Sequence, residues 1–197
     1  MARWEPDAQG RLLRAALELF AEHGYESTTT AQIAERAGLT KTTLFRLFAD
    51  KREIVFQGQS RLVTLLEQGV EEAPEDSSAL ALVTNGLRVL SRAHTDDQRR
   101  TGRILDPILA SSPELNERAI YKRFAITSAL EGALVKRQID RWSAGVLADM
   151  GVRAYYAGYA VWVESDDVAP LITYVIDQLD SLEDASSKLT RHSTTPS

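Results

Sequence analysis

Apolar residues recur along this chain at the three- and four-residue spacing of an amphipathic helix. No convincing stretch alternates between apolar and polar residues as a half-buried strand does. The first apolar stripe predicts a helix from Asp7 to His23, with Leu12, Ala16 and Phe20 on one face. Gly24 suits the left-handed position that ends many helices. The sequence therefore predicts an all-α fold and argues against sheet-based enzyme folds.

Two short helices joined by a glycine are predicted next. Residues 29–32 match a capping box, in which two side chains satisfy backbone N–H groups at the start of a helix over 30–37. Gly38 permits a sharp turn into a second helix over 41–48. The small side chain of Ala34 lies where the two helices would cross. This order predicts a helix-turn-helix.

Residues 50–53 match a second capping box, which opens one long predicted helix through Leu66. A proline and polar cluster at 73–78 indicates a loop, and Pro107 predicts a bend or break in its helix. Later helices are expected over 79–93, 98–110, 113–139, 143–163 and 168–182. We therefore expect a three-helix domain over residues 1–50, a larger helical domain over 51–184 and a disordered tail over 185–197, which is rich in Ser and Thr.

Composition fits a globular protein without disulfide chemistry. The 197 residues are 44% apolar and 26% charged, which is close to the average for such proteins. No cysteine is present, so disulfides, thiolate metal sites and thiol nucleophiles are excluded. The first residues have no apolar stretch of signal-peptide length, and the longest apolar run, 160–163, is far too short to cross a bilayer. A cytoplasmic protein without membrane contact is expected.

Charge is unevenly distributed along the chain. The net charge of −5 argues against nucleic-acid binding as a first hypothesis, because phosphates attract lysine and arginine. A solvated charged face is the ordinary explanation of a basic cluster. Here the cluster coincides with the predicted helix-turn-helix, which favours a nucleic-acid interface. Between residues 36 and 52 a single acidic residue, Asp50, stands against five basic ones: Arg36, Lys41, Arg46, Lys51 and Arg52.

Motifs of catalysis are not found in the sequence. It holds no G-x-S-x-G elbow, phosphate-binding loop or dinucleotide-binding fingerprint. The histidines His23, His94 and His192 are expected in a helix end, a loop and the tail. The run 94–97 is interpreted as a solvated turn and not as a cation site. We therefore expect neither an enzyme nor a bound metal or cofactor.

The stretch from Arg11 to Phe56 resembles the TetR family of bacterial transcriptional repressors. The likeness rests on ALELFAEHGYESTTTAQIAERAGLTKTTLFRLFADKREIV, in which the glycine-aromatic pair, the threonine run, the AGLTKTTLFRLF core and the closing lysine follow family order. The resemblance implies that the first domain binds double-stranded operator DNA. It also implies that the larger domain dimerises and holds a small-molecule effector whose binding releases the DNA. The expected function is that of a homodimeric repressor of a palindromic operator.

Nine residues are expected to contact DNA: Thr28, Thr29, Thr40, Lys41, Thr42, Thr43, Phe45, Arg46 and Lys51. The first two threonines can donate to a phosphate together with the helix N-terminus behind them. Thr40 and Lys51 match family positions that face the DNA backbone. Lys41, Thr42 and Arg46 can reach base edges. Many family members have tyrosine and histidine where this chain has Phe45 and Arg46, so an operator sequence cannot be transferred.

Two further sets of residues are assigned to the larger domain. A four-helix bundle across a two-fold axis is predicted to use Gly151, Ala154, Gly158, Leu171, Val175 and Leu179. Burial of the same residues within one subunit is the alternative. Polar or aromatic residues that interrupt apolar faces form a candidate effector site: Asn85, Arg103, Asp106, Phe124, Thr127, Glu131 and Tyr155. Each of these alone is more often a surface residue or a satisfied core residue.

Two other functions are left open by the residues. A helical adaptor would bind another protein and use the first fifty residues only as a bundle. An all-α enzyme would need an active site that carries no known motif. The salt dependence of DNA affinity distinguishes the repressor from the adaptor, because contacts with DNA phosphates release bound counterions.

Overall fold

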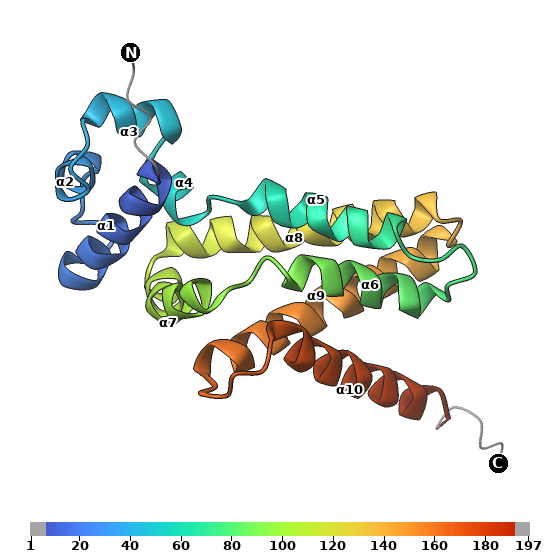
Figure 1. Ribbon diagram of the computed structural model, residues 1–197. Coiled ribbons are helices and arrows are strands. Elements are labelled where there is room, and N and C mark those ends of the chain that lie inside the picture. Colours follow the sequence, from blue (N-terminus) through green and yellow to red (C-terminus); the bar gives the residue numbers. More distant parts are fainter. Residues whose placement is uncertain (1–6, 192–197) are drawn as a thin grey trace. The chain divides into compact units, whose positions relative to one another are not determined.

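The computed structural model describes residues 7–191, and the chain in this range is helical without any strand (Figure 1). The predicted all-α fold is confirmed for these residues. None of the described helices has the length and apolarity needed to cross a membrane. Ten helices are formed within the range: α1 (Ala8–His23), α2 (Thr30–Arg36), α3 (Lys41–Leu47), α4 (Lys51–Val55), α5 (Gln59–Glu71), α6 (Ala79–Ser91), α7 (Asp96–Ser111), α8 (Pro113–Lys136), α9 (Arg141–Glu164) and α10 (Leu171–Arg191).

The chain divides into two compact units. The first unit is formed by residues up to 59 together with 101–120, and the second by residues 60–100 together with those from 121 onward. The first unit is larger than the predicted domain over 1–50, because the end of α7 and the start of α8 share its core. Ile108 and Leu115 are buried in the same cluster as Leu12, Leu44 and Ile54. Helices α7 and α8 therefore contribute residues to both units.

Local signals in the first unit act as the sequence predicts. The Thr29 hydroxyl accepts from the Gln32 N–H at 3.3 Å, and the Gln32 side-chain oxygen accepts from the Thr29 N–H at 2.8 Å. Gly38 has a φ of +65° in the turn between α2 and α3. Thr40 caps α3 by accepting from the Thr43 N–H at 3.1 Å. The predicted capping box, turn and second cap are all confirmed.

The single long helix predicted after Asp50 is wrong. The chain forms the short α4 and the separate α5 instead. Between them Gly58 has a φ of +82°, a left-handed conformation that interrupts a right-handed helix and favours glycine. Asp50 does cap α4, and its carboxylate accepts from the N–H groups of Arg52 and Glu53 at 2.8 and 3.1 Å.

Helices α9 and α10 lie against each other in the second unit, and glycine permits their close approach (Figure 1). A Cβ atom on Gly158 would lie 2.7 Å from the backbone of Val175, and one on Gly151 would lie 2.7 Å from the Val83 side chain. The residues assigned to the dimer interface thus pack inside one subunit, which is the alternative that the sequence left open, and the four-helix bundle across a two-fold axis stays a prediction. All six are buried in the single chain: Gly151, Ala154, Gly158, Leu171, Val175 and Leu179.

Two arginines bind helix ends in the second unit. The Arg137 guanidinium donates to carbonyl oxygens within residues 70–74, at the end of α5. Arg99 is 9% exposed and donates to carbonyl oxygens within residues 162–167, at the end of α9. The last carbonyl groups of a helix have no partner inside the helix, so these side chains satisfy them.

A break at Pro107 and a disordered segment from residue 185 to 191 are not observed. Helix α7 continues through Pro107 without a break, and the neighbouring Ile108 and Leu109 contribute to the first unit's core, which offsets the hydrogen bond that proline cannot donate. Helix α10 continues to Arg191, so residues 185–191 are helical and the predicted tail is wrong there. An ion pair between Lys188 and Asp184, one turn apart, supports this last part of the helix. Residues 192–197 lie outside the described range.

Candidate nucleic-acid interface

Helices α2 and α3 form a helix-turn-helix whose shared core holds both helices in place. Ile33 and Leu44 are fully buried, and Ala34 is 2% exposed. The Leu39 N–H donates to the Ala34 carbonyl oxygen at 2.8 Å and closes the turn around Gly38. The predicted motif is thus present, with one face of α3 in the core and the other face outside.

The outer face of α3 carries the side chains that were predicted to reach base edges. Lys41, Thr42, Phe45 and Arg46 are all exposed. The Lys41 ammonium lies 5.7 Å from the centroid of the Phe45 ring, which is 47% exposed. Within residues 7–191 neither Lys41 nor Arg46 forms an ion pair. Two positive charges without an acidic partner therefore face outward from α3.

The threonines of this segment differ in what their hydroxyls do. The hydroxyl oxygens of Thr40 and Thr43 lie 2.9 Å apart at the start of α3, and Thr40 is exposed. Thr29 is also exposed, within its capping box. Thr28 is 2% exposed, and its hydroxyl donates to the Gly24 carbonyl oxygen at 2.8 Å. The prediction that the Thr28 hydroxyl binds phosphate is wrong, because the group is buried and already bonded.

Two of the basic residues counted in the sequence, Arg36 and Arg52, form ion pairs with acidic residues of the first unit. Arg36 binds two glutamates of α1, and the nearer contact joins its guanidinium to Glu22 at 2.9 Å. This hydrogen bond holds the pKa of Glu22 below its usual value. Arg52 binds Asp50 at 2.6 Å and Glu114 at 3.1 Å. The local charge count therefore overstates the cationic surface, which centres on the two free charges of α3.

Lys51 joins the start of α4 to the segment before α2. Its ammonium donates to the carbonyl oxygens of Tyr25 at 2.7 Å and Thr28 at 3.3 Å. It also lies 4.0 Å from the centroid of the Tyr25 ring. An ammonium group has three donors, and two are used here. Lys51 therefore has a structural role, and its contact with a DNA phosphate stays a prediction for the remaining donor.

The residues predicted to hold an effector have separate surroundings. Arg103 and Asp106 belong to the first unit. In the second unit the Asn85 side chain donates to a carbonyl oxygen of α5, Glu131 binds an arginine of α9, and Phe124 is 66% exposed. The Thr127 hydroxyl donates to a carbonyl oxygen of its own helix. The predicted convergence on one cavity is therefore wrong for the second unit, because the sequence pattern did not show which helix faces meet.

Tyr155, the last of that set, belongs to a buried aromatic cluster that the sequence analysis missed. Its hydroxyl lies 3.0 Å from Nε2 of His94. The His94 ring meets the rings of Tyr155, Tyr159 and Trp162 edge-on, at centroid distances between 5.7 and 6.1 Å. Burial lowers the pKa of His94 to about 4, whereas Thr95, Asp96 and Asp97 of the predicted solvated turn are exposed. The three- and four-residue spacing of the aromatic residues on α9 was the available signal.

Two hydroxyl groups close to this cluster in sequence are buried without a partner. Oγ of Ser91, on the last turn of α6, and Oη of Tyr156 form no hydrogen bond among the described residues. Burial raises the pKa of Tyr156 to about 12, and the Arg123 guanidinium lies 4.2 Å from the centroid of its ring. An unpaired buried hydroxyl costs about 1 to 3 kcal/mol and is often satisfied by water or a ligand. Nδ1 of His94 is likewise buried without a hydrogen bond among the described residues.

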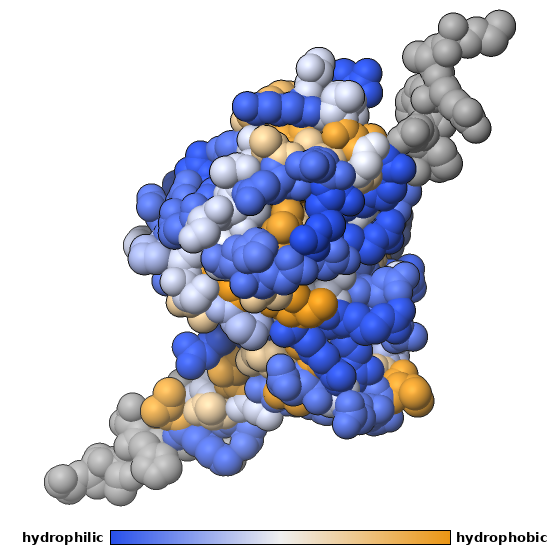
Figure 2. All heavy atoms as spheres, turned by 90° about the vertical axis from the view of Figure 1, so that its left-hand side faces the viewer, coloured by the Kyte–Doolittle hydropathy of each residue, from blue (hydrophilic) through white to orange (hydrophobic). Residues whose placement is uncertain are grey.

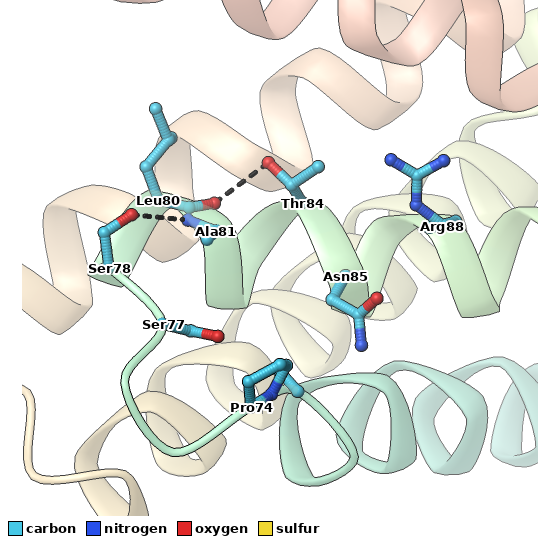
Figure 3. A pocket seen from close by; sticks show the side chains of 9 residues that line it. Pro74, Ser77, Ser78, Leu80, Ala81, Thr84, Asn85 and Arg88 are labelled. Carbon is cyan, nitrogen blue, oxygen red and sulfur yellow. Dashed lines mark hydrogen bonds between the residues drawn. The ribbon is translucent and has the colours of Figure 1, made fainter.

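An open groove of about 470 Å³ lies between the loop after α5 and helix α6 (Figure 3). Ser78 caps α6 by accepting from the Ala81 N–H at 3.2 Å, and Thr84 donates to the Leu80 carbonyl oxygen at 2.9 Å. The hydroxyls of Ser78 and Thr84 are thus used within α6. The molecular face drawn in Figure 2 is largely hydrophilic, with separate hydrophobic patches.

The helix-turn-helix segment matches known bacterial regulators. Residues 12–57 match the family described as bacterial regulatory proteins, tetR family. An HTH-type transcriptional regulator of Mycobacterium tuberculosis is 34% identical over 98 residues, which are 49% of this chain and 50% of that protein. TcmR of Streptomyces glaucescens is 35% identical over 80 residues, or 41% and 35% of the two chains. RutR of Escherichia coli is 26% identical over 160 residues, or 81% and 64%. The chain thus spans about half the length of the first of these relatives and less than two thirds of the others.

Solved structures share the fold at low sequence identity. A transcriptional regulator from Pseudomonas aeruginosa PAO1 matches with a TM-score of 0.58 and 15% identity, over 95% of this chain and 96% of that chain. FadR from Bacillus subtilis, solved with stearoyl-CoA, matches with a TM-score of 0.52 and 17% identity, over 87% and 95%. Residues 12–57 therefore match the DNA-binding segment of tetR-family regulators, and the chain as a whole shares its helical fold with solved transcriptional regulators.

Proposed function

We propose that this protein is a homodimeric repressor that binds a palindromic operator and loses affinity for it when a small molecule binds the second unit. The observation that carries the proposal is the outer face of α3. Lys41, Thr42 and Arg46 are exposed there, and the two cations have no acidic partner within residues 7–191. The major groove of B-DNA admits an α-helix, and its base edges offer acceptors to such side chains.

Base contacts and phosphate contacts are assigned to different residues. Arg46 is suited to guanine, because its guanidinium can donate to O6 and N7 together. Lys41 can donate to the same atoms, and the methyl group of Thr42 can contact thymine. The exposed hydroxyls of Thr29 and Thr40 are assigned to phosphate oxygens, which fix the position of the helix without reading sequence. Dimerisation would place two such helices roughly 34 to 36 Å apart, one turn of DNA.

Release of DNA is assigned to a molecule that satisfies the unpaired hydroxyls of Ser91 and Tyr156. Coupling between two sites is commonly about 1 to 3 kcal/mol, so a modest preference of the ligand for a non-binding arrangement would suffice. FadR from Bacillus subtilis, which shares the fold, was solved with stearoyl-CoA, and this compound is a reasonable first probe. It should lower operator affinity at constant salt if the second unit takes an acyl-CoA.

Binding to the DNA upstream of its own gene, measured across salt concentrations, tests the proposal. If each subunit neutralises about four phosphates, the log affinity of the dimer should fall against log salt with a slope near −7. An unrelated duplex of equal length serves as the control and should bind more weakly at every salt concentration. A slope near zero, with no preference for the upstream duplex, would favour the helical adaptor and overturn the repressor.

A further inference from the structure

The buried aromatic cluster around Tyr155 lies close to the place where three helices of the second unit meet. At Gly151 helix α9 packs against α6 and α8, because a Cβ atom there would lie 2.7 Å from the Val83 side chain and 3.2 Å from that of Leu130. Tyr155 and Tyr156 follow one turn later on α9. The cluster therefore has neighbours from three separate parts of the chain.

The unpaired buried polar atoms of the second unit gather in this cluster. Among the described residues of that unit they are Oγ of Ser91, Nδ1 of His94 and Oη of Tyr156. Ser91 is 5% exposed, and its carbonyl oxygen accepts from the His94 N–H at 3.1 Å. The rings of Tyr155 and Tyr156 meet edge-on with their centroids 5.0 Å apart, which joins Tyr156 to the same group. Buried polar atoms in folded proteins nearly always have partners, so their concentration here indicates a place for a polar ligand or for water.

Two positive charges lie next to these atoms. The Arg123 guanidinium lies 4.2 Å from the centroid of the Tyr156 ring. Arg123 is exposed, and it forms no ion pair among residues 7–191. Beside it on α8, Lys122 acts on His94, whose pKa is lowered by burial and, to a smaller extent, by the charge of this lysine. Cations together with hydroxyl donors are the groups that bind a carboxylate, so the surroundings favour an anionic ligand.

The walls of the cluster are aromatic. Centroid distances are 6.4 Å between the rings of Tyr155 and Tyr159 and 5.9 Å between those of Tyr159 and Trp162. Aromatic rings attract further rings at such separations, stacked or edge-on. The Arg123 guanidinium covers the face of the Tyr156 ring, and exposed side chains commonly change rotamer on binding. The ring of a ligand could therefore replace the guanidinium on Tyr156 while Arg123 pairs with an acidic group of the same ligand.

We propose that this cluster is the effector site of the second unit and that its ligand is a small aromatic carboxylate. In this arrangement the carboxylate accepts from the Arg123 guanidinium and the Tyr156 hydroxyl, and the aromatic part of the ligand lies against the Tyr156 ring. The inference rests on the proposed function and assigns its effector to a chemical class. Stearoyl-CoA belongs to a different class, because its acyl group is a thioester without a free carboxylate.

Calorimetric titration of the full chain with three small probes tests the class of ligand. Benzoate has the carboxylate and the aromatic ring, benzamide keeps the ring without the charge, and cyclohexanecarboxylate keeps the charge without the aromatic ring. Benzoate should bind on the order of tenfold more tightly than benzamide, because its hydrogen bonds involve a charged group. It should also bind more tightly than cyclohexanecarboxylate, because rings in contact attract one another. Equal affinity for benzoate and either other probe, or no binding of benzoate at millimolar concentration, would overturn the proposal.

Substitutions test the location of the site. Arg123→Gln and Tyr156→Phe each remove one donor to the carboxylate and should weaken benzoate binding on the order of tenfold. Arg88→Gln is the matched control and should leave benzoate affinity unchanged, because Arg88 is exposed on α6 and lines the groove of Figure 3. A loss confined to Arg88→Gln would place benzoate in that groove, and no loss in the first two variants would mean that water satisfies the cluster. Either result contradicts the proposal, and circular dichroism of each variant identifies misfolding.

Binding to the upstream duplex, measured with and without benzoate, separates this inference from the proposed function. If the duplex is bound with the expected salt dependence and benzoate does not bind, only the effector assignment is wrong. If benzoate binds and responds to the substitutions while the duplex is not bound, the repressor function is wrong and the site stands. Benzoate that binds at the cluster without lowering affinity for the duplex would show that the cluster is not the effector site.

Discussion

The Lys51 ammonium lies 4.0 Å from the centroid of the Tyr25 ring and donates to the Tyr25 carbonyl oxygen at 2.7 Å. One side chain thus holds the start of α4 against the segment that leads into α2. Lys51→Met keeps the apolar stem and removes the charge. We expect it to lower the free energy of unfolding by about 1 to 2 kcal/mol, since a charged hydrogen bond and a cation–π contact are lost at a partly exposed site. Urea denaturation measures this change.

The same variant should weaken binding to all operator sequences alike, because it loosens the support of the helix-turn-helix and removes no base contact. Lys41→Met is the control. Its ammonium is exposed on α3, so operator affinity should fall while the free energy of unfolding stays constant. Unchanged stability of Lys51→Met would contradict the structural role of Lys51.

Arg46→Ala should relax sequence preference at one base pair of each half-site. The lost guanidinium contact is expected to cost about 1 to 3 kcal/mol on the preferred sequence and little on a sequence changed at that position. Competition binding against operators substituted one base pair at a time measures this change in sequence preference. Arg36→Ala serves as the comparison, because Arg36 binds Glu22 and should not alter base preference. Equal losses on every operator would mean that Arg46 contacts a phosphate.

Two ion pairs join α4 to the start of α8. In one the acidic residue belongs to α4, and in the other it belongs to α8. Glu53 binds Arg118 at 3.1 Å, and Arg52 binds Glu114 at 3.1 Å. Glu114 and Arg118 are one helical turn apart, so a one-turn slide of α8 would bring like charges together. The pairs therefore fix the register of α8 against α4 within the first unit.

A double-mutant cycle on Glu53 and Arg118 measures this contact. Each single reversal, Glu53→Arg or Arg118→Glu, should lower the free energy of unfolding by about 0.5 to 1 kcal/mol, which is modest because both groups are partly exposed. The double reversal restores opposite charges and should regain most of the loss. Strictly additive effects of the two substitutions would show that the two side chains do not interact.

Short-range features were predictable because their causes lie in neighbouring residues. The capping box of Thr29 and the turn at Gly38 each depend on residues within a few positions, and both are formed. Gly58 escaped notice because a glycine within an apolar period is compatible with a continuous helix. Only its left-handed φ of +82° shows that the chain turns there.

Long-range partners could not be predicted from spacing. The sequence pattern placed Arg36 in a DNA-binding surface. In the structure its guanidinium instead binds the carboxylate of Glu22, which lies fourteen positions earlier in the chain. The glycines of α9 were compatible with a second subunit or with the same chain, since both need a close backbone approach. In the structure the space beside Gly158 is filled by Val175 of the same chain. The small residues on a helix face therefore predict close packing, but they do not show whether the packed segment belongs to the same chain or to a second subunit.

Tyr156→Phe should stabilise the protein in the absence of any effector. The substitution removes a buried hydroxyl that has no partner among the described residues, and relief of its desolvation is expected to raise the free energy of unfolding by about 1 kcal/mol. Tyr155→Phe is the matched control. It removes a hydroxyl that bonds His94 at 3.0 Å, so it should lower stability by a similar amount. Thermal unfolding of both variants decides the point, and a loss of stability in Tyr156→Phe would show that its hydroxyl is already satisfied.

His94 should make the protein sensitive to acid. Burial, with a smaller effect from the charge of Lys122, lowers the pKa of His94 to about 4 from the usual 6.5. The unfolded chain therefore takes up this proton first, and the stability that depends on neutral His94 is fully present above pH 6.5. It is lost as the pH falls from 6.5 towards 4, to a total of roughly 3 kcal/mol.

The free energy of unfolding, measured at pH 7.5 and pH 4.5 for the wild type and His94→Gln, isolates this contribution. Glutamine can keep a hydrogen bond to Tyr155 but does not titrate. Carboxylates affect both proteins equally, so the difference between their pH dependences reports His94 alone. We expect the wild type to lose about 2 to 3 kcal/mol more than the variant between the two pH values, because charging a buried imidazole is opposed by its aromatic surroundings. Parallel losses in the two proteins would mean that the imidazole is hydrated and that the buried cluster is open to water.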